Sequence, residues 1–218
     1  MSIPLSVVII SKNEENFIKD AILSANFADE VLLVDSGSID KTCLIANELG
    51  AKVLTQDWLG FGQQKNKAID LARNNWVFVL DSDERITSEL KLEICNIMLN
   101  PLFDGYFVAR LNNFFGKYIK TCGLYPDYTI RLFNKKKGRF NDVDVHESVI
   151  LNGSVGKLKC HMIHLAYESF DEFIVKQKRY AKLSSKNNNI FKALVSPCWV
   201  FIKIFFIKLG FLEGWRGF

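Results

Sequence analysis

Two carboxylates directly after an apolar run are the residues of this sequence best suited to catalysis. Asp81 and Asp83 flank Ser82 at the end of such a run, and carboxylates at this spacing can hold a divalent cation against a diphosphate. A second D-x-D pair, Asp142 and Asp144, follows a basic stretch instead. We therefore expect chemistry at the first pair, against the alternative that its carboxylates are solvated turn or helix-capping residues.

Two further polar clusters follow apolar runs in the same way. Asp35 opens the sequence D-S-G-S, and Ser11 opens S-K-N-E. Such side chains can accept hydrogen bonds from a nucleobase or a ribose, and the alternative is that they form turns and cap the next helices. Neither cluster has the glycine pattern of a dinucleotide site or of a P-loop, which argues against both enzyme classes.

A glutamate and the histidines offer acid–base and metal chemistry later in the chain. Glu147 follows His146, and a carboxylate there can take a proton from an acceptor hydroxyl. His161 and His164 form H-x-x-H without the glutamate of a metalloprotease helix. One histidine can still complete a D-x-D metal site, and the alternative for each histidine is a structural role.

The pattern of apolar residues predicts the elements that must position these groups. Short apolar runs predict buried strands at 5–10, 31–34, 52–55 and 76–80. Helical periodicity predicts helices at 18–27, 44–49, 63–73 and 87–99. This alternation predicts a parallel α/β sheet, in which ligands bind beyond the carboxyl ends of the strands. All three polar clusters fall at those ends.

The pattern changes after Pro101. Alternating strands are predicted at 105–110 and 128–133, separated by an aromatic, turn-rich segment at 114–127. Helices are predicted at 168–186 and 191–209. We interpret the two parts of the chain as a nucleotide side and an acceptor side of one α/β domain.

Composition limits the class of protein and its compartment. The 218 residues are 49% hydrophobic and 24% charged, which predicts a globular domain and excludes a disordered, collagenous or coiled-coil chain. Five cysteines without a C-x-x-C pair favour a reducing compartment. The sequence shows no basic, cleavable leader and no charge-free run of 18 apolar residues. We therefore expect a cytoplasmic protein without a membrane span.

Charge is divided unevenly along the chain. Residues 174–218 hold nine lysines and arginines and a single acid, Glu213, whereas residues 1–173 carry a net charge of −4. This split predicts a domain at 1–173 and a basic, apolar helical tail at 174–218. The tail can rest on the anionic inner face of a membrane, where each lysine adds about 1 kcal/mol. The alternatives are a helix packed on the domain and a nucleic-acid-binding tail, against which the acidic front part argues.

Eight segments, in this order, are similar to family 2 glycosyltransferases of the GT-A fold, in particular to the bacterial group that includes lipopolysaccharide core β-glucosyltransferases. The V-D-S-G-S and F-G-Q-Q-K-N sequences together are specific, whereas a lone D-x-D is not. The segments lie at 7–15, 28–42, 57–68, 76–85, 104–110, 125–133, 145–149 and 210–218.

The resemblance implies a fold, a reaction and partners. The fold is a mostly parallel central sheet flanked by helices, with a mixed acceptor-side half and C-terminal helices. The reaction is an inverting, Mn²⁺- or Mg²⁺-assisted transfer of a hexose, with glucose expected, from a UDP-sugar to a lipopolysaccharide or lipooligosaccharide core. The implied location is the cytoplasmic face of the inner membrane, reached through the basic tail, and no nucleic-acid partner is expected.

The resemblance also implies residue roles. Glu147 takes the position of the catalytic base, although the wider family has E-D where this chain has His146-Glu147. Asp83 and His164 are expected to hold the metal. Residues implied in donor binding are Ile10, Ser11, Asn13, Glu14, Asp35, Gln64, Lys65, Asn66, Asp81, Ser82 and Asp83. Residues implied on the acceptor side are Gly123, Tyr125, Asp127 and His146.

Other functions remain open from the sequence. A transferase of the same fold can act on another cell-envelope glycan, and a scaffold of the same fold can lack activity. A nucleotidyltransferase shares the front half but normally has a glycine- and arginine-rich loop where this chain has S-K-N-E-E. A nucleic-acid-binding module would use the basic tail.

Overall fold

The computed structural model describes residues 3–142, 147–167, 170–171, 173–175, 178 and 199–217. They form two compact units. The first contains residues up to 110 together with 128–163, and the second contains residues 111–127 together with those from 164 onward. The predicted boundary at residue 173 falls inside the second unit and stays a prediction.

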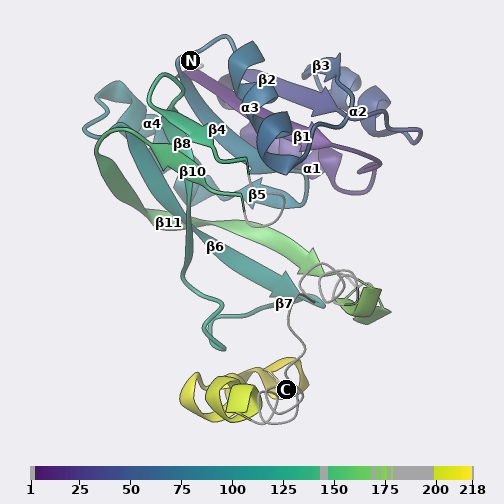
Figure 1. Cartoon of the computed structure of the whole chain (residues 1–218), viewed down its shortest axis with the longest axis vertical. Helices are drawn as coiled ribbons and strands as arrows, with labels where there is room; N and C mark the ends of the chain where they lie inside the picture. Colours follow the sequence, from purple (N-terminus) through teal and green to yellow (C-terminus); the bar gives the residue numbers. More distant parts are fainter. Residues whose placement is uncertain are drawn as a thin grey trace. The chain divides into compact units, whose positions relative to one another are not determined.

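A parallel sheet forms the N-terminal part of the first unit (Figure 1). Its strands lie in the order β3-β2-β1-β4, and each adjacent pair is parallel. Their bounds are β1 Ile3–Ser11, β2 Ala28–Asp35, β3 Lys52–Thr55 and β4 Trp76–Asp81. All four predicted strands are confirmed.

The remaining strands make the sheet mixed, as predicted for the acceptor-side half. Beyond β4 the order continues β8-β6-β11-β5, with β7 paired to β6, and β8 runs antiparallel to β4. The bounds are β5 Glu84–Ile86, β6 Gly105–Phe114, β7 Lys117–Tyr118, β8 Asp127–Asn134 and β11 Val155–Tyr167. A separate two-stranded sheet pairs β9 Gly138–Phe140 with β10 Val149–Leu151.

Helices cover both faces of the parallel part of the sheet, which explains why β1, β2 and β4 are mostly apolar. Alternate residues of β1 face opposite sides: Val7 belongs to the core beneath α1 and α4, and Val8 belongs to the core beneath α3. Both side chains are at most 1% exposed. The helices are α1 Ile18–Ala25, α2 Thr42–Glu48, α3 Phe61–Leu71 and α4 Ser88–Leu99. Each predicted front-half helix is confirmed.

The second unit contains the β6–β7 turn, the segment up to Asp127 and the C-terminal residues. A helix at 199–202 continues as a π-helical turn at Lys203–Ile207, and a 3₁₀ segment covers Gly210–Gly217. The predicted helix at 191–209 is confirmed from residue 199, and most of the predicted helix at 168–186 lies outside the described residues. None of the helices among the described residues is long and apolar enough to cross a membrane.

Candidate active site

The carboxyl ends of β1, β2 and β4 meet at one edge of the sheet. In the strand register, Ser11 lies beside Asp35, and Ile10 lies beside Asp81. The three polar clusters that follow these strands are therefore neighbours in space. The structure confirms their expected convergence beyond the strand ends.

Asp35 organises the loop after β2. It is 1% exposed, and its carboxylate accepts hydrogen bonds from the Ser11 hydroxyl at 2.9 Å, the Gly37 amide at 2.9 Å, and both the amide and the hydroxyl of Ser38. Burial would raise the pKa of Asp35, but the bonds from Ser38 and Ser11 outweigh it and hold the pKa below its usual value. These four donors fill the acceptor positions of a carboxylate, which is the geometry of a turn-forming residue. Its role toward a nucleotide stays a prediction.

The loop after β1 is fastened to the loop after β2. Asn13 has a left-handed backbone with φ +56°, a conformation that asparagine tolerates better than most residues. The backbone amide of Asn13 donates to the Ser38 hydroxyl at 2.8 Å, and its side-chain Oδ1 accepts from the Ile39 backbone amide at 2.9 Å. The Glu14 amide donates to Thr42 Oγ1 at 2.8 Å. Both loops thus form one rigid wall beside the end of β4.

Arg85 fixes the D-x-D turn between β4 and β5. Its guanidinium donates at 2.7 Å to the carbonyl oxygens of Ser82, Glu84 and Phe17. The fully buried Glu84 carboxylate accepts from the Asp81 amide at 3.0 Å. The backbone that presents Asp81 and Asp83 is therefore held from two sides.

A network of charged side chains, built around two buried cations, lies at the end of β4. Lys65 Nζ is 2.9 Å from Asp81 Oδ1 and 2.8 Å from Glu147 Oε1. Arg131 Nη2 is 2.7 Å from Asp81 Oδ2 and 2.6 Å from Glu84 Oε1. The side chains of Lys65 and Arg131 are each 4% exposed. Two cations therefore hold three carboxylates that come from β4, β5 and the segment before β10.

The network keeps Asp81 ionised. Burial would raise the pKa of Asp81, but the charges of Arg131 and Lys65 outweigh it and hold the pKa well below its usual range. The pKa of Arg131 is raised, because Asp81 and Glu84 outweigh the effect of its burial. Both carboxylate oxygens of Asp81 are thus bound by the protein's own cations. The metal-binding role of Asp83 stays a prediction.

The chemistry of Asp83 fits a metal shared with a substrate. The described part of the chain contains no group of three or more His, Cys, Asp or Glu side chains arranged around one ion position. Mg²⁺ sites for nucleotides are commonly built from one or two carboxylates and the substrate's phosphate oxygens. The D-x-D turn can supply a carboxylate of that kind, and a diphosphate would supply further oxygens.

His164 lies in the second unit, and its tautomer suits a metal ligand. Its Nδ1 is 2.7 Å from Asn112 Oδ1, and Asn112 Nδ2 donates to the Leu124 carbonyl at 3.1 Å. With Asn112 Nδ2 turned to Leu124, Asn112 Oδ1 is the acceptor for Nδ1–H, and Nε2 is the nitrogen that a neutral ring would offer to a metal. Asp83 belongs to the first unit, so a metal shared by Asp83 and His164 stays a prediction.

The three predicted donor residues of α3 have different surroundings. Gln64 is fully buried and donates to Ser36 Oγ at 3.0 Å. Asn66 pairs with both backbone groups of Phe140 at 2.9 Å. Of the three, Lys65 reaches the charged network, while Gln64 holds α3 against the loop after β2 and Asn66 holds it against β9. A Cβ at Gly62 would overlap the Asn141 carbonyl, so glycine permits the close approach that brings Lys65 to Glu147.

The residues predicted on the acceptor side belong to the second unit or fall outside the described residues. Gly123 belongs to the second unit, as do Tyr125 and Asp127. His146 falls in the undescribed segment 143–146. Their predicted roles stay predictions.

Sequence reasoning missed Arg131 and Glu84. A signal was present for Arg131, because it interrupts the apolar segment Ile130–Phe133, and a fully buried arginine is almost always paired. Glu84 directly follows the D-x-D motif and becomes fully buried at the start of β5. Neither the partner of Arg131 nor the burial of Glu84 follows from local sequence.

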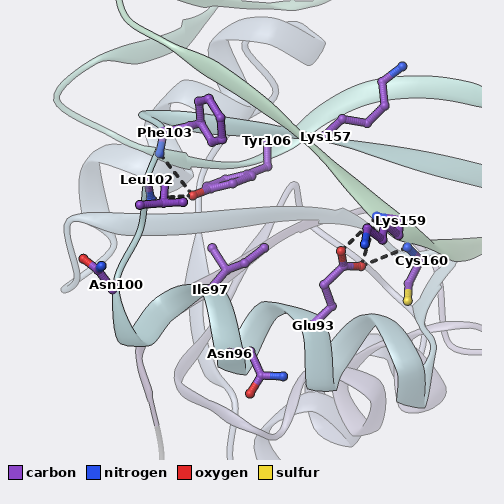
Figure 2. A pocket seen from close by; sticks show the side chains of 10 residues that line it. All are labelled: Glu93, Asn96, Ile97, Asn100, Leu102, Phe103, Tyr106, Lys157, Lys159 and Cys160. Atoms are coloured by element: carbon purple, nitrogen blue, oxygen red, sulfur yellow. Dashed lines mark hydrogen bonds between the residues drawn. The ribbon is translucent and has the colours of Figure 1, made fainter.

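A separate hollow of about 590 Å³ lies against α4 and the starts of β6 and β11, as Figure 2 shows. Two of its polar side chains are hydrogen-bonded to backbone amides. Glu93 accepts from the amides of Lys159 and Cys160 at 2.9 Å, and Tyr106 Oη accepts from the amides of Leu102 and Phe103. The hollow shares no lining residue with the charged network. It therefore does not enter the account of the active site.

The sequence profile described as Glycosyl transferase family 2 matches residues 6–151, the part that carries every member of the charged network. The chain belongs to this family. An uncharacterized glycosyltransferase of Rickettsia bellii is 34% identical over 98% of this chain and 80% of its own length. The lipopolysaccharide core biosynthesis glycosyltransferase LpsC of Rhizobium meliloti is 29% identical over 98% of this chain and 83% of its own length.

The fold matches solved glycosyltransferases of the GT-A type. The crystal structure of S. aureus TarS 1–349 in complex with UDP-GlcNAc superposes with a TM-score of 0.59 at 18% identity. The match covers 78% of this chain and 60% of that chain. The predicted family, the GT-A fold class and the assignment as a transferase enzyme are all confirmed.

Proposed function

We propose that this glycosyltransferase moves a hexose, with glucose expected, from a UDP-sugar to a lipopolysaccharide-type core glycolipid, with inversion at the anomeric carbon. The observation that carries the proposal is the ammonium of Lys65, which lies between Asp81 at 2.9 Å and Glu147 at 2.8 Å. It joins the donor motif to the predicted base within one buried network. The name of LpsC supports the acceptor class, and the UDP-GlcNAc bound to TarS supports the donor class.

Glu147 would act as the base of a single displacement. Its carboxylate takes the proton of the acceptor hydroxyl while that oxygen forms a bond to the anomeric carbon. The bond from the anomeric carbon to the diphosphate breaks on the opposite face, and UDP leaves with the electron pair. One carboxylate is enough for this inversion, whereas retaining enzymes of the glycosidase type use a second carboxylate as a nucleophile.

Lys65 and Arg131 fix the carboxylates around the reacting groups. Lys65 Nζ donates to Glu147 and also pairs with Asp81, so the base has one defined position relative to the D-x-D turn. Asp83, and His164 through Nε2, are the groups that we expect to hold Mn²⁺ or Mg²⁺. A metal bound there would neutralise charge on the leaving diphosphate.

Product stereochemistry tests the proposed reaction. The protein should release UDP from UDP-glucose in the presence of a truncated lipopolysaccharide core, and NMR of the product should show a β-linked sugar from the α-linked donor. UDP-galactose and UDP-GlcNAc serve as comparison donors, and another cell-envelope glycan serves as a comparison acceptor. An α-linked product would contradict the single displacement. Turnover only with the other glycan would contradict the acceptor assignment.

The tail is expected to contact an anionic membrane surface. Its described part exposes large apolar side chains, among them Trp199 at 58%, Phe206 at 57%, Ile207 at 65% and Trp215 at 61%. Exposed aromatic residues beside lysines are typical of interfacial binding. Vesicles with phosphatidylglycerol should therefore sediment the protein at low salt, and binding should weaken steeply as salt rises. Equal binding to neutral phosphatidylcholine vesicles, or none to either, would contradict this expectation.

A further inference from the structure

We propose that residues 210–217 form a C-terminal clasp that orders the acceptor-side loop, residues 115–124, and that Glu213 is its positioning residue. The inference rests on the proposed function, because the acceptor role of the loop comes from there. Its evidence is a set of contacts inside the second unit.

Glu213 is a buried carboxylate surrounded by donors from one short segment. It is 7% exposed and is the only acid among residues 174–218. Its Oε1 accepts from the Lys120 amide at 3.1 Å, the Thr121 amide at 3.3 Å and the Thr121 hydroxyl at 3.0 Å. Its Oε2 is 2.8 Å from Lys117 Nζ. A buried charge with this many partners is a built contact, since an unpaired carboxylate would not stay buried.

The next residues of the clasp hold the turn between β6 and β7. Arg216 donates from Nε to the Phe114 carbonyl at 3.2 Å and from Nη2 to the Phe115 carbonyl at 2.8 Å. The Trp215 ring stacks on the Phe115 ring, with 5.3 Å between centroids and 17° between planes. The C-terminal segment therefore adds polar and aromatic contacts to those that the turn already makes with Asn113 and Tyr167.

The loop end that carries Gly123 is held in the same way. The Cys122 amide donates to the Lys208 carbonyl at 2.9 Å. Gly123 has φ +71°, and a Cβ there would overlap the Lys208 side chain. On its other side the loop is held by Asn112, which donates to the Leu124 carbonyl. The segment before the clasp therefore shapes the loop as well.

Ordering the loop in advance should favour acceptor binding. Fixing a flexible loop during binding opposes binding through lost conformational entropy, and contacts that order the loop beforehand remove that penalty from the binding step. The ion pairs that Lys65 makes with Asp81 and Glu147 lie inside the first unit. Loss of the clasp should therefore change acceptor use and leave donor binding intact.

The test compares Glu213→Ala with Lys117→Ala and with a matched control, Glu48→Ala. Lys117→Ala removes only the ion pair, and Glu48 is an exposed glutamate at the end of α2. For each variant we would measure kcat/KM for the core acceptor, UDP affinity, and hydrolysis of the UDP-sugar in the absence of acceptor. Hydrogen exchange of residues 115–124 gives a readout that needs no donor.

Glu213→Ala should lower kcat/KM for the acceptor by about 10- to 100-fold, the effect expected when hydrogen bonds to a charged group are lost. Lys117→Ala should lower it by about two- to fivefold. UDP affinity and donor hydrolysis should stay within about twofold. Exchange of the loop should rise most in Glu213→Ala, less in Lys117→Ala and not in Glu48→Ala.

Two results would overturn the clasp: unchanged loop exchange in Glu213→Ala, or a fall in donor hydrolysis as large as the fall in acceptor transfer. If Glu213→Ala does not fold, unchanged acceptor use and loop exchange in Lys117→Ala would overturn it as well. A wild type that uses GDP-mannose and no UDP-sugar would instead overturn the proposed donor. The same comparison with GDP-mannose would then still decide the clasp.

Discussion

Glu147→Gln is expected to lower kcat by about 10²- to 10⁴-fold while UDP binding persists. The glutamine keeps the shape of the side chain and can still accept from Lys65, but it cannot take a proton from the acceptor hydroxyl. Because the base acts only as the acceptor attacks, the loss should fall on kcat and kcat/KM together, which indicates an interaction made in the transition state.

A matched control separates catalysis from charge. Glu93→Gln changes a glutamate that does not belong to the charged network. Glu93 lines the hollow beside α4 and accepts from the backbone amides of Lys159 and Cys160. Its kcat should stay near that of the wild type. A Glu147→Gln enzyme with more than about a tenth of wild-type kcat would fall below the range of general base catalysis and would exclude Glu147 as the base.

Arg131→Met is expected to lower the free energy of unfolding by about 3–5 kcal/mol, the effect of removing one partner from a buried ion pair. Glu84 would then remain fully buried without the cation that lies 2.6 Å away, and the partly buried Asp81 would lose the cation at 2.7 Å while keeping Lys65. Thermal and urea unfolding would measure the change, at roughly 2–4 °C in Tm per kcal/mol for a chain of this size.

Arg139→Met provides the comparison for this prediction. Arg139 also forms an ion pair, with Asp70 at 2.8 Å, but the side chains of that pair are 54% and 52% exposed. Exposed pairs contribute about 0–1 kcal/mol. Equal destabilisation by the two substitutions would show that burial of the Arg131 network adds nothing to stability.

The front half of the fold was predictable because its residues follow simple periodic rules. Strands buried on both faces appear as continuous apolar runs, and Lys52–Thr55 was located without error. The three-residue strands β5, β9 and β10 are too short to show any period. The long strand β11 alternates buried and exposed residues from Val155, but its lysines and histidines obscured that pattern.

The candidate site was only partly predictable, for a physical reason. The ends of parallel strands converge by topology, so the meeting of Ser11, Asp35 and Asp81 followed from the sheet alone. The partners of Asp81 did not, because Lys65 comes from α3 and Arg131 comes from β8. Such long-range charge pairing depends on the register of distant strands, which no local pattern encodes. The C-terminal clasp around Glu213 was missed for the same reason.

Calorimetric titration of UDP into the protein, with and without Mn²⁺, tests the central claim most directly. That claim is that the D-x-D turn at the end of β4 binds the diphosphate of a UDP-sugar. The account predicts micromolar binding that requires the metal and that Asp83→Ala abolishes, while Glu147→Gln leaves it intact. Absence of heat from folded protein under both conditions, or equal binding by Asp83→Ala, would contradict it.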